Sequence, residues 1–484
     1  MMASLNDRIE GVLLGTAAGD ALGAPYEFQP ARGPELPVEM VGGGPWEPGE
    51  WTDDTDMAIA IAEVASTGAD LRDPSAQDSI VARWHEWSLR AKDVGIQTRQ
   101  VLTTAARGGE ASAARARAAA EALHRQTGRT AGNGSLMRTA PVALAYLDDE
   151  DAMVVAARAV SELTHFDPDA ADATVLWCCA IRQAVRTTEL DIRIGLRHLP
   201  VDRRPLWGER IEQAEASRPA DFPNNGWVVA AFQAAWSAIT TTASRAGTAR
   251  AEHLRLGLDA AVRCGNDTDT VAAIAGGLLG AAYGASAVPL EWRRLLHGWP
   301  DMTARDLVAL ANTVARKGRP NRGPVYSGLR IGTLAAHPHD PNVLLGGVGV
   351  LRDLPPEVDA VVSLCRVADH DVPQGMPHIE VRLIDSTDPD ENPHLDFVLT
   401  EAVRTVEQLR EEGRTVLVHC VEAYSRTPTV AALYGARLRN IDVADALQDV
   451  LTALPHANPN PVFRNALRRL RNVNLLSEGT PRHG

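Results

Sequence analysis

At 484 residues, with 45% hydrophobic and 23% charged residues, the chain has an ordinary globular composition and is long enough for two or three domains. The formal net charge of −14 excludes a general nucleic-acid-binding surface, which would need a basic face. Five cysteines without CxxC pairs exclude a disulfide framework, no run of eighteen apolar residues occurs, and the opening MMASLNDRIE is charged within a few residues and lacks the apolar core of a signal peptide. We therefore expect a cytoplasmic protein without a membrane span.

The first part of the chain has helical periodicity almost throughout. Apolar residues recur at three- and four-residue spacing in DAMVVAARAVSEL, ATVLWCCAIRQAV and WVVAAFQAAWSAI. The interruptions, such as TAGNGSLM and SRPADFPNNG, are rich in Gly, Pro, Asn and Asp, as loops are. This pattern predicts an all-α domain over residues 1–315.

The sequence changes character at RKGRPNRGPVYSG, residues 316–328, which lacks apolar periodicity and which we interpret as a linker. Beyond it come short β-branched runs, NVLLGGVGVL, VDAVVSLC, IEVRLID and TVLVHC. Helical stretches such as PHLDFVLTEAVRTVEQLREEG separate some of these runs. Strands that alternate with helices predict an α/β domain over residues 329–484.

Two bursts of carboxylate and hydroxyl side chains, WTDDTD and GNDTDT, each lead into an apolar, helix-like stretch. Such hard oxygen ligands suit Mg²⁺, whereas Zn²⁺ would usually bring His or Cys. Four close carboxylates repel one another unless cations neutralise them, so one site for two cations would explain both bursts. The candidate ligands are Thr52, Asp53, Asp54, Asp267, Asp269 and Thr270.

Two other interpretations of these bursts stay open. Thr and Asp before an apolar run are ordinary N-caps, whose side-chain oxygens accept hydrogen bonds from free backbone N–H groups. Asp267 and Asp269 also have the DxDxT-like spacing of haloacid-type phosphatases. That motif requires an apolar strand just upstream, and AVRCGN does not provide one.

Five ordered segments carry a family resemblance: GVLLGTAAGDALGAPYEF, WTDDTDMAIAIAE, GNGSLMRTAPVAL, LTHFDPDAADA and GNDTDTVAAIAGGLLGAAYG. Together they resemble the ADP-ribosylglycohydrolase family, which includes the dinitrogenase reductase-activating glycohydrolases, over about residues 5–300. The resemblance implies an all-α fold with two Mg²⁺ ions, or Mn²⁺, that releases ADP-ribose from a modified protein, nucleic acid or small molecule. It also implies that the six residues named above are the metal ligands.

The same resemblance nominates a catalytic carboxylate. Breaking the bond at the ribose anomeric carbon builds oxocarbenium character, and an acid or base must serve the leaving group or the attacking water. Glu27 matches a glutamate that some family members use in this way, and Asp53 or Asp54 competes for the role. The alternative for Glu27 is a solvated loop carboxylate.

The turn formed by Gly132, Asn133, Gly134 and Ser135 precedes a helix, and its free N–H groups could cradle the pyrophosphate of ADP-ribose. Alone, such a turn is usually only a turn, but its place between the acidic motifs follows the family order. His165 stands where the family often carries a histidine near the ligand, although a lone histidine is more often structural.

A second chemical motif lies in TVLVHCVEAYSRTPTVAALYGARL, which predicts a strand, a short loop and a helix. Cys420 and Arg426 form a C-x5-R pattern with His419 before and Thr427 after, and it resembles the phosphate-binding loop of protein tyrosine and dual-specificity phosphatases over about residues 325–470. A loop with inward N–H groups at a helix N-terminus binds a phosphate dianion and lowers the pKa of a thiol. Cys420 would then attack phosphorus, Arg426 would clamp phosphoryl oxygens, and Thr427 would stabilise the leaving thiolate.

The acid that protonates the leaving oxygen is expected in IEVRLIDSTDPDENPHLD, which nominates Asp385, with Asp388 as the alternate. Two residues depart from the phosphatase pattern. Ala423 replaces a glycine and would be strained if the loop requires a positive φ there, and Glu422 places an anion near a dianion site. A degenerate phosphate-binding module therefore stays open beside an active phosphatase.

We predict a bifunctional protein with two substrate classes, one ADP-ribosylated and one phosphorylated. The competing hypothesis is a module that senses ADP-ribose or a related nucleotide and docks phosphorylated partners. The fusion also raises the hypothesis that both domains act on one substrate. If ADP-ribose sat on a terminal phosphate, the first domain would expose that phosphate and the second would remove it.

Overall fold

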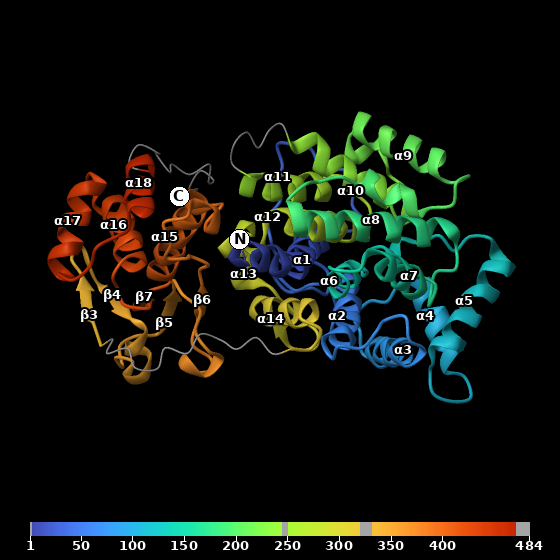
Figure 1. The fold of residues 1–484 in the computed structure, drawn as a ribbon, viewed down its shortest axis with the longest axis horizontal. Coiled ribbons are helices and arrows are strands. Elements are labelled where there is room, and N and C mark those ends of the chain that lie inside the picture. The colour runs from blue at the N-terminus through green and yellow to red at the C-terminus, as the bar shows by residue number, and fades with distance from the viewer. Residues whose placement is uncertain (1, 244–249, 320–331, 471–484) are drawn as a thin grey trace. The chain divides into compact units, whose positions relative to one another are not determined.

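The computed structural model describes residues 2–243, 250–319 and 332–470 (Figure 1). The chain divides into two compact units, Met2–Asn321 and Arg322–Gly484. Most of the predicted linker, from residue 320 onward, lies outside the described residues. Within those residues, no helix combines the length and the apolar character that a membrane span requires.

The N-terminal unit is helical, as its apolar periodicity predicts. Short 3₁₀ turns η1 (Ala24–Tyr26), η2 (Asn133–Ser135) and η3 (Arg193–His198) and a hairpin of β1 (His297–Gly298) and β2 (Met302–Thr303) complement its helices. The helices are α1 (Met2–Gly23), α2 (Asp53–Ser66), α3 (Pro74–Ser88), α4 (Ile96–Ala106), α5 (Ala113–Thr127), α6 (Ala140–Ala145), α7 (Glu150–Ser161), α8 (Pro168–Thr187), α9 (Arg204–Ala216), α10 (Val228–Ala243), α11 (Arg250–Val262), α12 (Thr268–Tyr283), α13 (Leu290–Leu295) and α14 (Ala304–Ala315).

Helices α1 and α12 lie side by side in the middle of this unit, with their backbones in direct contact (Figure 1). Glycines recur every four residues along α1, at 11, 15, 19 and 23, and so share one face of the helix. A Cβ at Gly15 would lie 2.3 Å from the carbonyl oxygen of Gly276, so only glycine permits this approach. At the end of the contact, a Cβ at Gly23 would lie 2.4 Å from Cα of Asp269. The glycine face therefore sets the end of α1 against the start of α12.

The C-terminal unit is an α/β domain, as predicted. Its strands are β3 (Leu334–His337), β4 (Asp340–Gly347), β5 (Ala360–Ser363), β6 (His378–Glu380) and β7 (Val416–Cys420), and its helices are α15 (Leu395–Glu411), α16 (Arg426–Arg439), α17 (Val443–Ala453) and α18 (Pro461–Leu470). The sheet order is β3-β4-β7-β5-β6, with β3 antiparallel to β4 and the other pairs parallel. The predicted strand NVLLGGVGVL ends earlier than its apolar run, at Gly347, because two consecutive glycines weaken strand structure.

Strand β7 occupies the centre of the sheet, and every one of its residues is buried. It ends at Cys420, and α16 begins six residues later at Arg426 after a five-residue loop. Ligands of parallel α/β sheets bind at the carboxyl ends of the strands, so this topology places the C-x5-R loop where such sites form.

Candidate active sites

The two acidic bursts lie at the starts of two helices, α2 and α12, and the fold brings them together. Thr52 Oγ1 and Thr270 Oγ1 donate hydrogen bonds to the same atom, Asp54 Oδ2, at 3.2 and 3.3 Å. Thr52 and Asp267 occupy the N-cap positions of α2 and α12, but neither side chain accepts a capping hydrogen bond. N-capping therefore does not explain why these side chains are present.

Asp20, near the end of α1, is a member of this cluster that sequence reasoning missed. Its Oδ1 accepts from the backbone N–H of Thr52 at 3.0 Å, and its Oδ2 accepts from the N–H and hydroxyl of Thr55 at 3.0 and 2.6 Å. Asp20 thus caps α2 from another helix. Burial raises the pKa of Asp20 to about 6, against which the Thr55 and Thr52 hydrogen bonds act.

The carboxylates form two trios that share one residue. Oxygens of Asp20, Asp54 and Asp269 lie within 4.8 Å of one another, and so do those of Glu27, Asp267 and Asp269. Oδ1 of Asp54 is buried and has no hydrogen-bond partner within the described part of the chain. A buried carboxylate oxygen without a partner is costly, and a cation would satisfy it. The donor set therefore fits a pair of hard divalent cations.

The electrostatics of the cluster agree with a cation site. Burial raises the pKa of Asp54 and of Asp269 well above the ordinary range, and their neighbouring carboxylates raise it further. Asp53 lies in neither trio among the described residues. Burial and then Asp93 raise its pKa to about 8, while a hydrogen bond from the backbone of Gly95 opposes the shift. The geometry thus groups Asp20, rather than Asp53, with the carboxylates around Asp269.

Glu27 reaches the cluster because the segment that carries it pairs with the residues before α12. The Phe28 N–H donates to the Asn266 carbonyl, and the Asn266 N–H donates to the Gln29 carbonyl, both at 2.7 Å. Burial and then Asp267 raise the pKa of Glu27 to about 8. Glu27 is half-buried, so the solvated loop carboxylate considered above does not describe it.

The glycine turn at Gly132–Ser135 is attached to the acidic cluster. Asn133 Nδ2 donates to Asp267 Oδ2 at 2.8 Å and to the Asn225 carbonyl at 2.9 Å. The hydroxyl of Ser135 is buried and has no hydrogen-bond partner among the described residues. The turn therefore lies beside the trio that contains Asp267, with one donor unused.

His165 lies against the same turn. A Cβ at Gly132 would be 3.2 Å from its Nε2, and a Cβ at Gly134 would be 3.1 Å from its Cε1. Arg138 Nη2 donates to Thr164 Oγ1 at 2.6 Å, so the Thr164 hydroxyl is free to donate to His165 Nδ1, 2.7 Å away. Burial lowers the pKa of His165 well below its ordinary value. We infer a neutral ring with its proton on Nε2.

The second site surrounds Cys420 in the C-terminal unit. Arg426 Nη1 donates to the carbonyls of Leu364 and Leu383 at 2.9 and 3.0 Å, which fixes the guanidinium from one side. Its Nε is buried without a hydrogen-bond partner, and so is Thr427 Oγ1, within the described part of this unit. These two unused groups beside the Cys420 loop are what a bound phosphoryl group would satisfy.

The two departures from the phosphatase pattern have different outcomes. Ala423 has φ of 51°, the left-handed conformation that makes this position strained for any residue with a Cβ. Glu422 is exposed, and its carbonyl accepts a hydrogen bond from His456 Nε2 at 3.1 Å. The backbone strain that the sequence predicts at Ala423 is therefore present in the structure, and the Glu422 side chain is exposed to solvent.

The segment 456–460 holds this strained loop in place. Besides the His456 contact, the Asn458 N–H donates to the Tyr424 carbonyl at 2.7 Å, and the Asn460 N–H donates to Ser425 Oγ at 3.1 Å. Asn460 Nδ2 also donates to Asp385 Oδ1 at 2.9 Å. Asn460 therefore connects the phosphate loop to the segment that carries the candidate acid.

Asp385 and Asp388 occupy different environments. Asp385 Oδ2 lies 3.9 Å from Arg426 Nε. Asp388 Oδ1 instead accepts from the N–H of Asp390 and caps the short turn η8 (Pro389–Glu391). Asp385 is therefore the carboxylate that lies near the Cys420 loop.

His419, the residue before Cys420, is hydrogen-bonded to Ser363 on the neighbouring strand β5. Its Nε2 lies 2.7 Å from Ser363 Oγ, which is also 2.9 Å from His378 Nε2. Burial lowers the pKa of His419 to about 4, so the ring is neutral at physiological pH.

Comparison with known proteins assigns both units. A family model described as ADP-ribosylglycohydrolase matches residues 1–323. The chain belongs to the ADP-ribosylglycohydrolase family. A model described as the catalytic domain of dual specificity phosphatases matches residues 356–473, so this ADP-ribosylglycohydrolase carries a second, phosphatase-like domain.

Individual proteins agree with this assignment. The chain is 30% identical over 296 residues to "ADP-ribosylarginine hydrolase Tri1" of Pseudomonas putida, covering 59% of this chain and 73% of the relative. It is 30% identical over 167 residues to "Dual specificity protein phosphatase 1" of Arabidopsis thaliana, covering 34% of this chain and 77% of the relative. A solved "ADP-ribosylglycohydrolase-related protein complex" is 31% identical with a TM-score of 0.51, covering 65% of this chain and 99% of that one.

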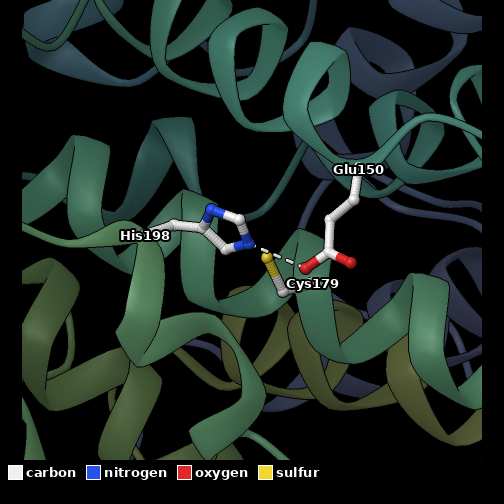
Figure 2. Close-up of side chains that lie close together, drawn as sticks. All are labelled: Glu150, Cys179 and His198. Atoms are coloured by element: carbon white, nitrogen blue, oxygen red, sulfur yellow. Dashed lines mark hydrogen bonds and ion pairs between the residues drawn. The ribbon is translucent and has the colours of Figure 1, made fainter.

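A third cluster in this ADP-ribosylglycohydrolase, outside both sites, brings together Glu150, Cys179 and His198 (Figure 2). Their side-chain types could hold a metal, but the Glu150 carboxylate is already neutralised. Arg182 Nη1 donates to it at 3.0 Å, Arg197 Nη2 also donates to it, and His198 Nε2 lies 2.7 Å away. Because two guanidinium groups would repel a cation, we interpret this cluster as an ion-pair network that ties α7, α8 and η3 together.

Proposed function

We propose that the N-terminal unit is an Mg²⁺-dependent hydrolase that releases ADP-ribose from arginine side chains. The observation that carries this proposal is the buried, unpartnered Oδ1 of Asp54, which belongs to one of two carboxylate trios that share Asp269. The arginine linkage is supported by the relative named ADP-ribosylarginine hydrolase. A cytoplasmic location is part of the proposal and agrees with five cysteines that are all free.

The residues that would hold two Mg²⁺ ions, with Mn²⁺ as the alternative, are Thr52, Asp53, Asp54, Asp267, Asp269 and Thr270. We add Asp20, whose hydrogen bonds to Thr52 and Thr55 hold the start of α2 in place. When bound, such ions would orient the ribose hydroxyls and lower the pKa of a bound water.

Glu27 is the proposed acid. Burial and Asp267 raise the pKa of Glu27, which favours a carboxyl that delivers its proton to the leaving guanidine nitrogen as the bond to the anomeric carbon breaks and water adds to that carbon. Asp53, whose pKa burial also raises, is the competing acid. Comparing Glu27→Gln with Asp53→Asn separates them, because loss of the acid removes the alkaline limb of the pH–rate profile.

The glycine turn is the proposed pyrophosphate site. Gly132 and Gly134 allow His165 to pack directly against the turn, since neither has a Cβ. The Nε2–H of His165 and the hydroxyl of Ser135 then supply hydrogen-bond donors, and both are uncharged in the free protein.

A turnover assay tests the N-terminal assignment. Defined ADP-ribosyl conjugates of arginine, serine, a nucleobase and a terminal phosphate are compared, with and without Mg²⁺. Asp54→Asn and Asp267→Ala are expected to lower release of ADP-ribose by more than about a hundredfold. Asp148→Asn is the matched control, because its side chain is 87% exposed. Equal turnover without Mg²⁺ contradicts the metal mechanism, and preference for another conjugate contradicts the arginine linkage.

For the C-terminal unit we propose a cysteine-dependent phosphatase, on the basis of the unpartnered Arg426 Nε and Thr427 Oγ1 beside Cys420. The Cys420 sulfur attacks phosphorus, the bond to the leaving oxygen breaks, and Asp385 protonates that oxygen. Water then cleaves the phosphocysteine and releases inorganic phosphate. Cys420→Ser is expected to abolish hydrolysis of p-nitrophenyl phosphate. If the wild type binds vanadate but shows no hydrolysis, this unit is a phosphate-binding module instead.

The alternative to the arginine linkage is one shared substrate, an ADP-ribosylated phosphate, on which the two units would act in sequence. In that case Cys420→Ser still releases ADP-ribose but leaves the phosphate on the target. If Cys420→Ser converts both substrate classes as the wild type does, the phosphatase role and the sequential reaction are both wrong.

A further inference from the structure

A pocket of about 600 Å³ opens beside the start of α2, apart from both carboxylate trios. It is formed by the loop before α2, the end of α3 with the residues that follow it, and the β1–β2 hairpin. Four of the ten tryptophans of the chain line it, namely Trp46, Trp51, Trp87 and Trp299. Such a concentration of indole rings indicates a ligand that aromatic faces recognise.

The floor of the pocket is rigid and carries a carboxylate. Asp56 Oδ1 accepts from Trp51 Nε1 at 3.0 Å, and Asp56 Oδ2 accepts from Trp87 Nε1 at 2.7 Å. Trp51 and Trp87 are buried, and a Cβ at Gly298 would lie 2.3 Å from Trp51 Nε1, so the first indole has no room to turn. The floor is therefore preorganised, with its indole N–H groups already used.

The rim shows which ligand chemistry the pocket accepts. Lys92 Nζ lies 5.3 Å from the centroid of the Trp46 ring and 2.6 Å from Glu50 Oε1. An ammonium over an indole face beside a carboxylate is a cation–π arrangement, made here by the chain's own half-exposed lysine. Trp46 and Trp299 are only half-buried, so both remain reachable from solvent.

The charges of the lining favour the same chemistry. Three carboxylates that are at least partly exposed, Glu47, Glu50 and Asp301, outnumber two permanent cations, Arg90 and Lys92. Asp56 is not counted with them, because burial raises its pKa well above the ordinary value. The lining would repel an anionic ligand, whereas an organic cation would be attracted by both the carboxylates and the aromatic faces.

We propose that this pocket binds a guanidinium or ammonium side chain from a basic peptide segment next to the modified residue of a protein substrate. Asp56 lies three residues, about one turn of α2, from Asp53, so a molecule that reaches the acidic cluster is able to place a neighbouring side chain in this pocket. The part of the proposal that places this ligand in a protein substrate rests on the proposed hydrolase function. The cationic character of the ligand rests on the pocket alone.

Binding of a probe without ADP-ribose tests the pocket independently of catalysis. The probe is the peptide acetyl-Gly-Arg-Gly-Arg-Gly-amide, titrated against the full chain by calorimetry. Trp299→Ala and Glu50→Gln are expected to weaken binding about two- to fivefold each. Lys92→Gln is expected to tighten it by a similar factor, because the ligand no longer displaces an ammonium from Trp46 and Glu50. Weaker binding in Lys92→Gln, or unchanged binding in all three variants, overturns the proposal.

Two further arms separate the possible sources of the cation. If free agmatine binds as tightly as the peptide, the ligand is a small molecule, and docking of a protein segment is overturned. In turnover assays, Trp299→Ala is expected to raise KM for an ADP-ribosylated basic peptide while leaving KM for ADP-ribosyl-agmatine unchanged. Absence of turnover on both substrates, with peptide binding intact, would reject the hydrolase function and keep the pocket assignment.

Discussion

The side-chain amide of Asn133 donates a hydrogen bond of 2.8 Å to Oδ2 of Asp267, which joins the glycine turn to the acidic cluster across 134 positions of sequence. This contact holds one carboxylate oxygen of Asp267 toward the turn. Asn133→Ala is expected to lower ADP-ribose release about tenfold or more and to raise the Mg²⁺ concentration for half-maximal activity, because Asp267 loses its orientation. The measurement is the Mg²⁺ dependence of kcat and KM.

Asn224→Ala is the matched control for this change, because Asn224 is exposed and its backbone carbonyl, not its side chain, accepts from Trp227. If both alanine variants show the same Mg²⁺ dependence as the wild type, the Asn133–Asp267 contact has no role in the site.

The metal-free N-terminal unit is expected to lose stability as pH rises. The pKa values of Glu27 and Asp53 are raised to about 8 in the folded state, mainly by burial. Between about pH 4 and pH 8 the folded state therefore binds more protons than the unfolded chain, whose carboxyls ionise near pH 4. The stability that these groups contribute is fully present below about pH 4 and is lost as pH rises to about 8.

Mg²⁺ should reverse this trend, because it competes with protons for Asp53 and the other carboxylates that are proposed as its ligands. At 100 times its dissociation constant, one Mg²⁺ site would add about 2.7 kcal/mol to the unfolding free energy. We expect a larger rise of Tm on adding Mg²⁺ at pH 8.5 than at pH 5, and none in Asp54→Asn. Tryptophan fluorescence reports this unit alone, since all ten tryptophans precede residue 300. An equal shift at both pH values would contradict the expectation.

The positions that sequence reasoning found are those whose motif is local. Thr52 and Asp54 stand close together in sequence, as do Asp267 and Thr270, so each burst is visible in a short window. Asp20 is not visible in such a short window, because it lies inside an apolar helix and its hydrogen-bond partners, Thr52 and Thr55, follow more than thirty residues later. The signal in the sequence that could have pointed to this helix was the four-residue spacing of glycines along α1, because such spacing predicts a helix that packs unusually close to another helix.

The same distinction holds in the C-terminal unit. The substitution at Ala423 could be recognised from the loop pattern, and its φ of 51° bears out the strain foreseen there. The supports of that loop could not be recognised, because Asn458 and Asn460 lie more than thirty residues away and act through backbone contacts. A hydrogen bond to a backbone group leaves no recognisable pattern of residue types.

Ala423→Gly is expected to stabilise the C-terminal unit slightly. Removing the Cβ at a left-handed residue relieves about 1–2 kcal/mol of strain, and the greater freedom of glycine in the unfolded chain costs about 0.5–1 kcal/mol. The net gain is therefore about 0–1.5 kcal/mol. Ala423→Val, which is branched at Cβ, should destabilise the unit instead.

The urea concentration that halves p-nitrophenyl phosphate hydrolysis measures both effects, because this unit contains no tryptophan. Should the glycine variant be less stable than the wild type while the valine variant is unchanged, the strain at residue 423 would be disproved.

Asn460→Ala is expected to impair the protonation step of the phosphatase. The Asn460 amide donates to Asp385 Oδ1 at 2.9 Å and to the Ser386 carbonyl at 3.2 Å, while its N–H donates to Ser425 Oγ. Without the side-chain contacts, Asp385 loses its orientation toward the leaving oxygen. Because a poor leaving group needs the acid more, kcat should fall about tenfold for phenyl phosphate and much less for p-nitrophenyl phosphate.

The control for this change is Asn465→Ala, because Asn465 is exposed and its side chain accepts from Arg468 on the same helix. Asp385→Asn should reproduce the leaving-group dependence of Asn460→Ala, and Asp388→Asn should not, since Asp388 is used as a cap. A purely structural role of Asn460 would lower kcat for both phosphate esters equally. That result would contradict the orienting role of Asn460, whereas a leaving-group effect that appears in Asp388→Asn and not in Asp385→Asn would move the acid from Asp385 to Asp388.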